Sequence, residues 1–94
     1  MRKIEEQMIN AVNNCKSLSV SNTLVTVSNN EVKVYLHGNL IYTKENGVER
    51  FTLAGWNTNT TRSRLRALGV DVCQRKRKPV YKGSEISSYK WYNV

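Results

Sequence analysis

The chain has 94 residues, of which 39% are hydrophobic and 23% charged, and its net charge is +8. Because a chain of this length supports one hydrophobic core, we predict a single domain over residues 1–94. The hydrophobic fraction argues against wholesale disorder, and no apolar run approaches the ~20 residues of a membrane span. Residues 1–6 become acidic where a signal peptide would become apolar, so we expect a cytoplasmic protein with no membrane partner.

The positive charge lies in the second half of the chain. Residues 1–49 hold five basic and five acidic side chains, whereas residues 50–94 hold ten basic and two acidic ones. Such a concentration increases self-repulsion and is typical of proteins that meet an anionic partner. Solubility alone is the alternative explanation.

Two cysteines, Cys15 and Cys73, stand 58 positions apart. In a cytosolic protein we expect both to be reduced and unbridged, and their apolar neighbours predict that both are buried. With one histidine in the chain they cannot complete a four-ligand zinc site, so we expect no metal and no other cofactor.

The first half of the chain predicts a helix followed by strands. Apolar residues recur at spacings of three and four from Ile4 to Cys15, which is typical of an amphipathic helix that packs on the core. Residues 23–27, 32–43 and 48–54 have β character. The pairs Asn29-Asn30 and Asn46-Gly47 between them favour tight hairpin turns, while Gly38-Asn39 indicates either a bulge or a turn. We predict three antiparallel strands as the minimum.

The second half predicts another helix and the closing strands. The polar connection 55–61 carries Trp56 and supplies N-cap residues to a short helix over 61–68, which Gly69 ends. Residues 70–74 return to strand. The basic turn 75–79 follows, and we expect Pro79 to stop regular pairing there. The fold class is α+β: an N-terminal helix, a three-stranded antiparallel meander, a short second helix, and two or three closing strands on one sheet.

Three segments together resemble a family of small tailed-bacteriophage proteins. They are Asn22-Thr23, Leu36-His37-Gly38-Asn39-Leu40-Ile41, and residues 53–65, which follow the pattern Gly-Trp-x-Thr-x-Thr-Thr-[Lys/Arg]-x-Arg-[Leu/Ile]. A strand of the Val-x-Gln-Lys type and a terminal Trp-Tyr pair usually follow in that family, and 72–75 and 91–92 occupy those places here. The stretch 79–88 departs from the usual pattern. The resemblance implies a phage source and the bacterial host cytoplasm, and it implies no activity or catalytic residue.

Basic and aromatic residues of the second half are the main candidates for a binding site. Exposed guanidinium and ammonium groups contact phosphates, while aromatic rings stack on unpaired bases. Helical spacing places Arg62 and Arg66 on one flank of the second helix and Arg64 on the opposite side. The candidate nucleic-acid-binding residues are Arg62, Arg64, Arg66, Arg75, Lys76, Arg77, Lys78, Lys82, Tyr89, Lys90 and Trp91. The alternative is that these aromatics close a small core and the basic turn is merely solvated.

Trp56 and His37 also admit two interpretations. Trp56 either walls an anion-binding loop or plugs the junction of the third strand and the second helix, and we expect it to be buried at that junction. His37 has no acidic residue spaced to orient it, and the chain has no catalytic carboxylate pair and no P-loop. We therefore predict that the protein is not an enzyme.

These patterns predict a small basic phage accessory protein that contacts nucleic acid, DNA or RNA, through the region of residues 62–66 and 75–82. The alternative is a protein-binding inhibitor or modulator of an acidic host factor, in keeping with host takeover, which the same charges would engage. The two differ in whether the protein binds nucleic acid or a host polypeptide.

Overall fold

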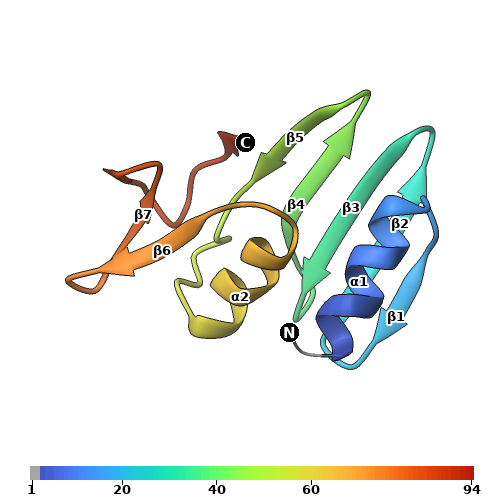
Figure 1. Cartoon of the computed structure of the whole chain (residues 1–94), viewed down its shortest axis with the longest axis horizontal. Helices are drawn as coiled ribbons and strands as arrows, with labels where there is room; N and C mark the ends of the chain where they lie inside the picture. The colour runs from blue at the N-terminus through green and yellow to red at the C-terminus, as the bar shows by residue number, and fades with distance from the viewer. Residues whose placement is uncertain (1–2) are drawn as a thin grey trace.

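The computed structural model describes residues 3–94; residues 1 and 2 of the predicted N-terminal segment lie outside this range. The fold is α+β, with two helices and antiparallel strands (Figure 1). The helices are α1 (Lys3–Asn13) and α2 (Asn59–Ala67). The larger sheet, in the order β1-β2-β3-β4-β5-β9, consists of β1 (Leu18–Val20), β2 (Thr23–Ser28), β3 (Glu31–Leu36), β4 (Asn39–Glu45), β5 (Val48–Phe51) and β9 (Tyr92–Asn93). The smaller sheet consists of β6 (Val72–Arg75), β7 (Lys78–Tyr81) and β8 (Ser84–Glu85).

Helix α1 forms as its apolar spacing predicts, and Met8, Ala11 and Val12 lie in the core. Its end differs from the prediction at Cys15. This residue is exposed, because it follows the last helical turn with a φ of 52° and allows the Lys16 amide to donate to the Ala11 carbonyl at 2.9 Å. The expected burial of Cys15 is therefore wrong.

The larger sheet is a meander of hairpins with two-residue turns. Asn29-Asn30 and Asn46-Gly47 form turns with φ positive at both positions, as hairpins prefer. Of the two interpretations at Gly38, a bulge or a turn, the structure shows a turn: His37-Gly38 forms a two-residue turn of the same kind. A bulge does occur, but further along β4, where Val34 pairs with Tyr42 and Tyr35 with Leu40. The extra residue is Ile41, and the bulge lets the consecutive side chains of Ile41 and Tyr42 both be buried.

Helix α2 begins two residues earlier than the prediction. Thr58 is its N-cap and accepts a hydrogen bond from the Thr61 amide at 3.2 Å. At the other end Gly69, with a φ of 92°, reverses the chain as expected, and the Val70 amide donates to the Leu65 carbonyl at 2.9 Å. Leu65 is fully buried and anchors the helix to the core.

The single sheet of the prediction is wrong, because the closing strands β6, β7 and β8 pair among themselves. Only β9 returns to the larger sheet, beside β5. Three aromatic rings connect the sheets: Phe51 of β5 meets Tyr81 of β7 edge-on with centroids 4.8 Å apart, and Tyr92 of β9 lies 5.8 Å from the same Phe51 ring. One continuous core therefore runs through both sheets.

The prediction that Pro79 stops regular strand pairing is wrong, because Pro79 lies inside β7 opposite Gln74. The pair next to the two-residue turn is Arg75 with Lys78, so Pro79 occupies the following position, where no amide hydrogen bond to β6 is needed. Its carbonyl accepts a hydrogen bond from the Ile86 amide at 3.0 Å. An additional strand, β1, which the sequence analysis does not predict, pairs with β2.

Helix α1 covers β2 and β3 of the larger sheet, and α2 lies near the start of β4 (Figure 1). Helix α1 contacts β1 and β2, and α2 contacts α1, β4 and β6. The β6–β7 hairpin and α1 stand at opposite ends of the longest axis of the molecule (Figure 1). Two regions are thereby left accessible: the β6–β7 hairpin, and the gap between the start of α2 and the β3–β4 turn.

Candidate functional site

Arg64 is buried, with 2% of its surface exposed, so the expectation that its guanidinium is exposed is wrong. Its Nη1 donates to Glu5 Oε2 at 2.8 Å and its Nε donates to Thr23 Oγ1 at 3.1 Å. Its Nη2 is 3.4 Å from Asn22 Oδ1. Glu5 of α1 is buried with it and also accepts a hydrogen bond from the Ser63 hydroxyl. This ion pair ties α1 to α2.

Arg62 is also buried, at 5% exposed, and its guanidinium is occupied by the loop before its own helix. It donates to Asn57 Oδ1 and to Asn59 Oδ1, the latter at 2.5 Å. Burial and the neighbouring Arg66 charge lower the pKa of Arg62. The expectation of an exposed Arg62 is therefore wrong as well, and its side chain instead stiffens residues 57–59.

The other predicted site residues are all exposed. They are Arg66, Arg75, Lys76, Arg77, Lys78, Lys82, Tyr89, Lys90 and Trp91. Residues 75–78 form the end of the β6–β7 hairpin, which we call the basic hairpin. Its turn is Lys76-Arg77, with φ of 50° and 63°, and Arg75 pairs directly with Lys78 across it. Within residues 3–94 the one ion pair of the basic hairpin joins Lys78 to Glu85 at 3.8 Å, with both side chains mostly in water.

Trp56 lies in the open, with 58% of its surface exposed, so the predicted burial is wrong. The chain turns at Ala54-Gly55, with φ of 52° and 80°, and the Trp56 amide donates to the Leu53 carbonyl at 2.8 Å. This turn fills the junction with Leu53, which is fully buried, and directs the indole outward.

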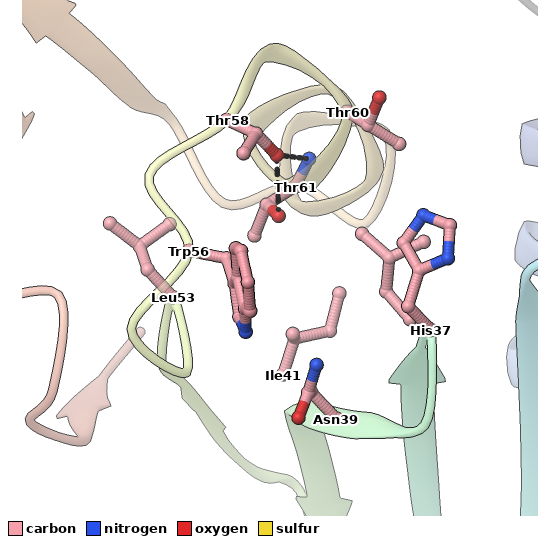
Figure 2. Close-up of a pocket in the computed structure, with 9 residues that line it drawn as sticks. His37, Asn39, Ile41, Leu53, Trp56, Thr58, Thr60 and Thr61 are labelled. Atoms are coloured by element: carbon pink, nitrogen blue, oxygen red, sulfur yellow. Dashed lines mark hydrogen bonds between the residues drawn. The ribbon is translucent and has the colours of Figure 1, made fainter.

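The indole walls a hollow of about 400 Å³, which we call the Trp56 hollow. Its apolar lining comes from Leu36, Ile41 and Leu53. Its polar lining comes from His37, Asn39, Thr58, Thr60 and Thr61. Figure 2 shows the indole along one side, His37 on the opposite side, and Asn39 between them on the side toward which the indole nitrogen points.

The C-terminal segment contacts the turn that precedes Trp56. The Gly55 amide donates to the Ser88 carbonyl at 2.7 Å, and a methyl group on Gly55 would stand 2.9 Å from the ring of Tyr89. Tyr89 is 82% exposed, so its ring and that of Trp56 are two accessible aromatic surfaces on adjoining segments. The sequence placed Tyr89 in the candidate site but gave no indication of this neighbour.

The opposite wall of the hollow is connected to the buried ion pair. Asn22 Nδ2 is 3.4 Å from His37 Nε2, while Asn22 Oδ1 accepts hydrogen bonds from Thr23 and Arg64. The Asn22 amide group therefore has its nitrogen free to donate, and His37 Nε2 is the acceptor. Arg64 thus positions a wall of the hollow although it does not reach the hollow itself.

The three segments that resemble phage proteins meet here. Asn22-Thr23 holds Arg64, residues 36–41 line one side of the hollow, and residues 53–61 line the other. His37 and Asn39 belong to the phage-like motif 36–41, but the sequence pattern did not indicate that they line a site. The hollow forms because the β3–β4 turn lies close to the start of α2, and no local sequence pattern indicates this proximity.

Other chemistry is sparse in the part of the chain that the structure describes. Residues 3–94 hold no cluster of three His, Cys, Asp or Glu side chains placed to bind a metal ion. Cys73 is free and exposed, so its expected burial is wrong; it alternates on β6 with Val72, which faces the core. Neither α1 nor α2 is long and apolar enough to cross a membrane.

The fold and the accessible surfaces define a small basic α+β protein with a charged hairpin and an aromatic-walled hollow. The family model described as Kyanoviridae Gp96 protein matches residues 1–93, so the chain belongs to this family of tailed-phage proteins. The expected phage source is confirmed at the level of the family. No curated protein and no solved structure matches the chain.

Proposed function

We propose that this phage protein is a non-enzymatic nucleic-acid-binding protein whose principal phosphate contacts come from the basic hairpin. The observation that carries the proposal is the composition of the Lys76-Arg77 turn. Each of the other two-residue turns has glycine or asparagine in at least one position, as in Asn46-Gly47 and Lys82-Gly83. These residues enter the left-handed conformation most readily, whereas other L-residues are disfavoured by ~1–2 kcal/mol each.

The charges of the turn add to that conformational penalty. Arg75 and Lys78 are direct cross-strand neighbours, and like charges in that position destabilise a hairpin. Arg75, Lys76 and Lys78 also line one shallow hollow of about 290 Å³ on the small sheet. The turn is thus unfavourable both in backbone conformation and in charge. A bound polyanion would neutralise the charges and so gives a reason for this turn sequence.

The aromatic residues beside the C-terminal segment support a single-stranded form of this partner. Tyr89 and Trp91 are exposed and flank Lys90. Exposed rings next to cations stack on unpaired bases while the cations hold the phosphates. Lys82 adds a further cation at the other end of β7, 5.3 Å from the ring of Tyr81.

The test uses the double variant Lys76→Asn/Arg77→Gly, which installs the preferred turn chemistry and removes two charges. We expect its melting temperature to rise, because both positions lose their strain, while its affinity for a labelled single-stranded oligonucleotide falls. Fluorescence anisotropy over a salt series measures that affinity. If about five phosphates are neutralised, log affinity falls against log salt with a slope near −3.5 for single strands, or near −4.5 for duplex. The double variant reduces the single-strand slope by about 1.4.

The matched control is Lys3→Gln/Lys16→Gln, which removes the same charge from exposed positions around α1, at the other end of the molecule (Figure 1). Its slope stays near the wild-type value if the hairpin is the contact surface. Equal losses in both double variants would mean that only net charge matters, and the proposal would fail. Absence of binding at ~50 mM salt would instead favour the alternative, an acidic host protein, which a pull-down with and without nuclease would detect.

A further inference from the structure

The Trp56 hollow holds none of the cations assigned to phosphate contact. Its lining contains one titratable side chain, His37, and no lysine, arginine or carboxylate. It is therefore poorly suited to a phosphate and well suited to a neutral, planar and partly polar group. Its volume of about 400 Å³ lies within the ~300–1,000 Å³ range of small-molecule sites.

We propose that the Trp56 hollow takes one unpaired nucleobase of a bound strand, stacked on the indole of Trp56 and read at its edge by Asn39. This inference rests on the proposed nucleic-acid binding, and it names the form of the ligand and the place of one base. A base within a duplex is stacked on both faces, so only a single-stranded or unpaired base can enter.

The wall that would carry the stack is rigid as well as exposed. The Trp56 carbonyl accepts from the Thr58 amide at 2.9 Å, its amide donates to Leu53, and Gly55 is held by Ser88. The indole is a large apolar ring on a hydrogen-bonded loop, and Leu36 and Ile41 form an apolar floor of the hollow. A nucleobase could stack on this ring with little loss of conformational entropy in the loop.

The polar edge of the hollow matches the edge of a nucleobase. The side-chain amide of Asn39 forms no hydrogen bond with any residue between 3 and 94, and it presents a donor and an acceptor side by side. Nucleobases present adjacent donors and acceptors in the same way, and asparagine reads such edges. Asn39 directly follows the His37-Gly38 turn and pairs with Leu36, which sets the position of its backbone at the hollow.

The position of Tyr89 allows the strand to continue out of the hollow. Its exposed ring packs against Gly55, the residue before Trp56, and Lys90 and Trp91 follow it in the chain. A neighbouring base can therefore stack on Tyr89 while its phosphate meets Lys90. The hollow, Tyr89 and Lys90 then act on one strand.

The experiment starts from Trp91→Phe, which leaves Trp56 as the sole tryptophan of the chain. We expect an eight-nucleotide single-stranded oligonucleotide to quench its fluorescence with saturation, and a duplex of the same length not to. A nucleoside monophosphate serves as the second probe and distinguishes a free nucleotide from a strand. If it binds as tightly as the oligonucleotide, the assignment to a strand is overturned.

Affinity is measured in parallel by anisotropy in the otherwise wild-type chain. Trp56→Ala is expected to weaken oligonucleotide binding roughly 5- to 150-fold, the range measured for one stacked base, by the same factor at every salt concentration. Trp56→Phe keeps an aromatic ring and recovers most of the affinity. Asn39→Leu is expected to reduce the difference between adenine and thymine oligonucleotides. Val48→Ala, a truncation at an exposed apolar residue outside the hollow, should leave the affinity unchanged.

The failure of this inference is distinguishable from the failure of the proposed function. If the oligonucleotide binds with the expected salt slope but Trp56→Ala binds equally well, the base site is wrong and the hairpin contact stands. If the duplex quenches Trp56 as strongly as the single strand, the base site is also wrong. If no oligonucleotide binds at ~50 mM salt, both proposals fall.

Discussion

At the scale of single residues, the most consequential side chains are the charged ones inside the protein. Glu5 and Arg64 are 4% and 2% exposed and lie 59 positions apart in the chain. Removal of Glu5 would leave the Arg64 guanidinium in the interior without its carboxylate, and breaking a buried pair in this way costs about 3–5 kcal/mol. That is a large part of the ~5–15 kcal/mol typical of a whole domain.

We therefore expect Glu5→Gln or Arg64→Met to lower the free energy of unfolding strongly, as measured by urea denaturation. The double variant Glu5→Gln/Arg64→Met should be more stable than the Glu5→Gln single, because the buried Arg64 charge is then absent. The control is Glu31→Gln, which breaks the partly exposed pair with Lys33 at 3.5 Å and should cost less than about 1 kcal/mol. Additive effects of the two buried substitutions would contradict this account.

Cys15 provides a prediction in the stabilising direction. It holds a φ of 52° at the end of α1, where glycine is the preferred residue. Cys15→Gly should raise stability by roughly 1 kcal/mol, since it relieves the left-handed strain, whereas Cys15→Ala should not. Thermal unfolding under reducing conditions measures both variants, and a melting temperature of Cys15→Gly at or below that of Cys15→Ala would argue against it.

Tyr42 makes stability depend on pH in the alkaline range. It is 1% exposed, and burial, followed by the charge of Glu49 and a hydrogen bond to it, raises the pKa of its phenol. In the unfolded chain the phenol ionises near pH 10. Above that pH the unfolded state loses a proton that the native state keeps, so stability is present in full below pH ~10 and declines as pH rises.

The expected decline attributable to Tyr42 is up to about 1.4 kcal/mol per pH unit. Urea unfolding of the wild type and of Tyr42→Phe between pH 8 and 11 measures it, because the variant lacks the titrating phenol. The wild type should lose stability more steeply than the variant. Parallel profiles would show that Tyr42 does not carry the effect.

At the scale of structural elements, the Ala54-Gly55 turn connects the larger sheet, the Trp56 hollow and the C-terminal segment. Gly55 meets two demands at once: a φ of 80° and the close approach of Tyr89. Gly83 has the same φ of 80°, yet a methyl group there would meet nothing within 4 Å. A comparison of substitutions at these two glycines therefore distinguishes the effect of backbone strain from the effect of contact with a neighbour.

Gly55→Ala should therefore destabilise the protein more than Gly83→Ala, as measured by thermal unfolding. The addition of Tyr89→Ala should reduce the excess, since the crowding atom belongs to that ring. The same substitution at Gly83 should be insensitive to Tyr89→Ala. If Gly55→Ala and Gly83→Ala cost the same, Tyr89 does not pack on the turn as described.

The elements were more predictable from sequence than the site. Hairpins carry local information, and the pairs Asn29-Asn30 and Asn46-Gly47 mark turns by their own chemistry, so the meander and both helices follow from short patterns. The burial of Arg64 depends on Glu5, which is distant in the chain, and the exposure of Trp56 depends on how one turn directs its ring. Neither is encoded locally, so helical spacing wrongly placed the guanidinium in water and hydrophobicity wrongly placed the indole in the core.

At the scale of the whole molecule, the two sheets are joined through the ring of Phe51, which meets Tyr81 and Tyr92. Because one core crosses this junction, we expect both sheets to unfold together. Phe51→Leu removes the edge-on contact and leaves a gap in a fully buried position. It should cost a few kcal/mol, within the ~1–5 kcal/mol range of core substitutions.

Native-state hydrogen exchange tests that cooperativity. In the wild type the slowest amides of β3 and β7 should report the same free energy of opening, and in Phe51→Leu the β7 amides should exchange sooner than those of β3. If the slowest β7 amides of the wild type exchange faster than the slowest β3 amides, the small sheet opens independently.

The lengths of the outer strands of the larger sheet have a consequence for the behaviour of the protein at high concentration. Strand β1 has three residues and β9 has two, whereas β2, β3 and β4 between them have six, six and seven. A second molecule that approaches either border finds too few free backbone groups to extend the sheet. We therefore expect the larger sheet to resist edge-to-edge growth at high protein concentration while these two short border strands remain in place.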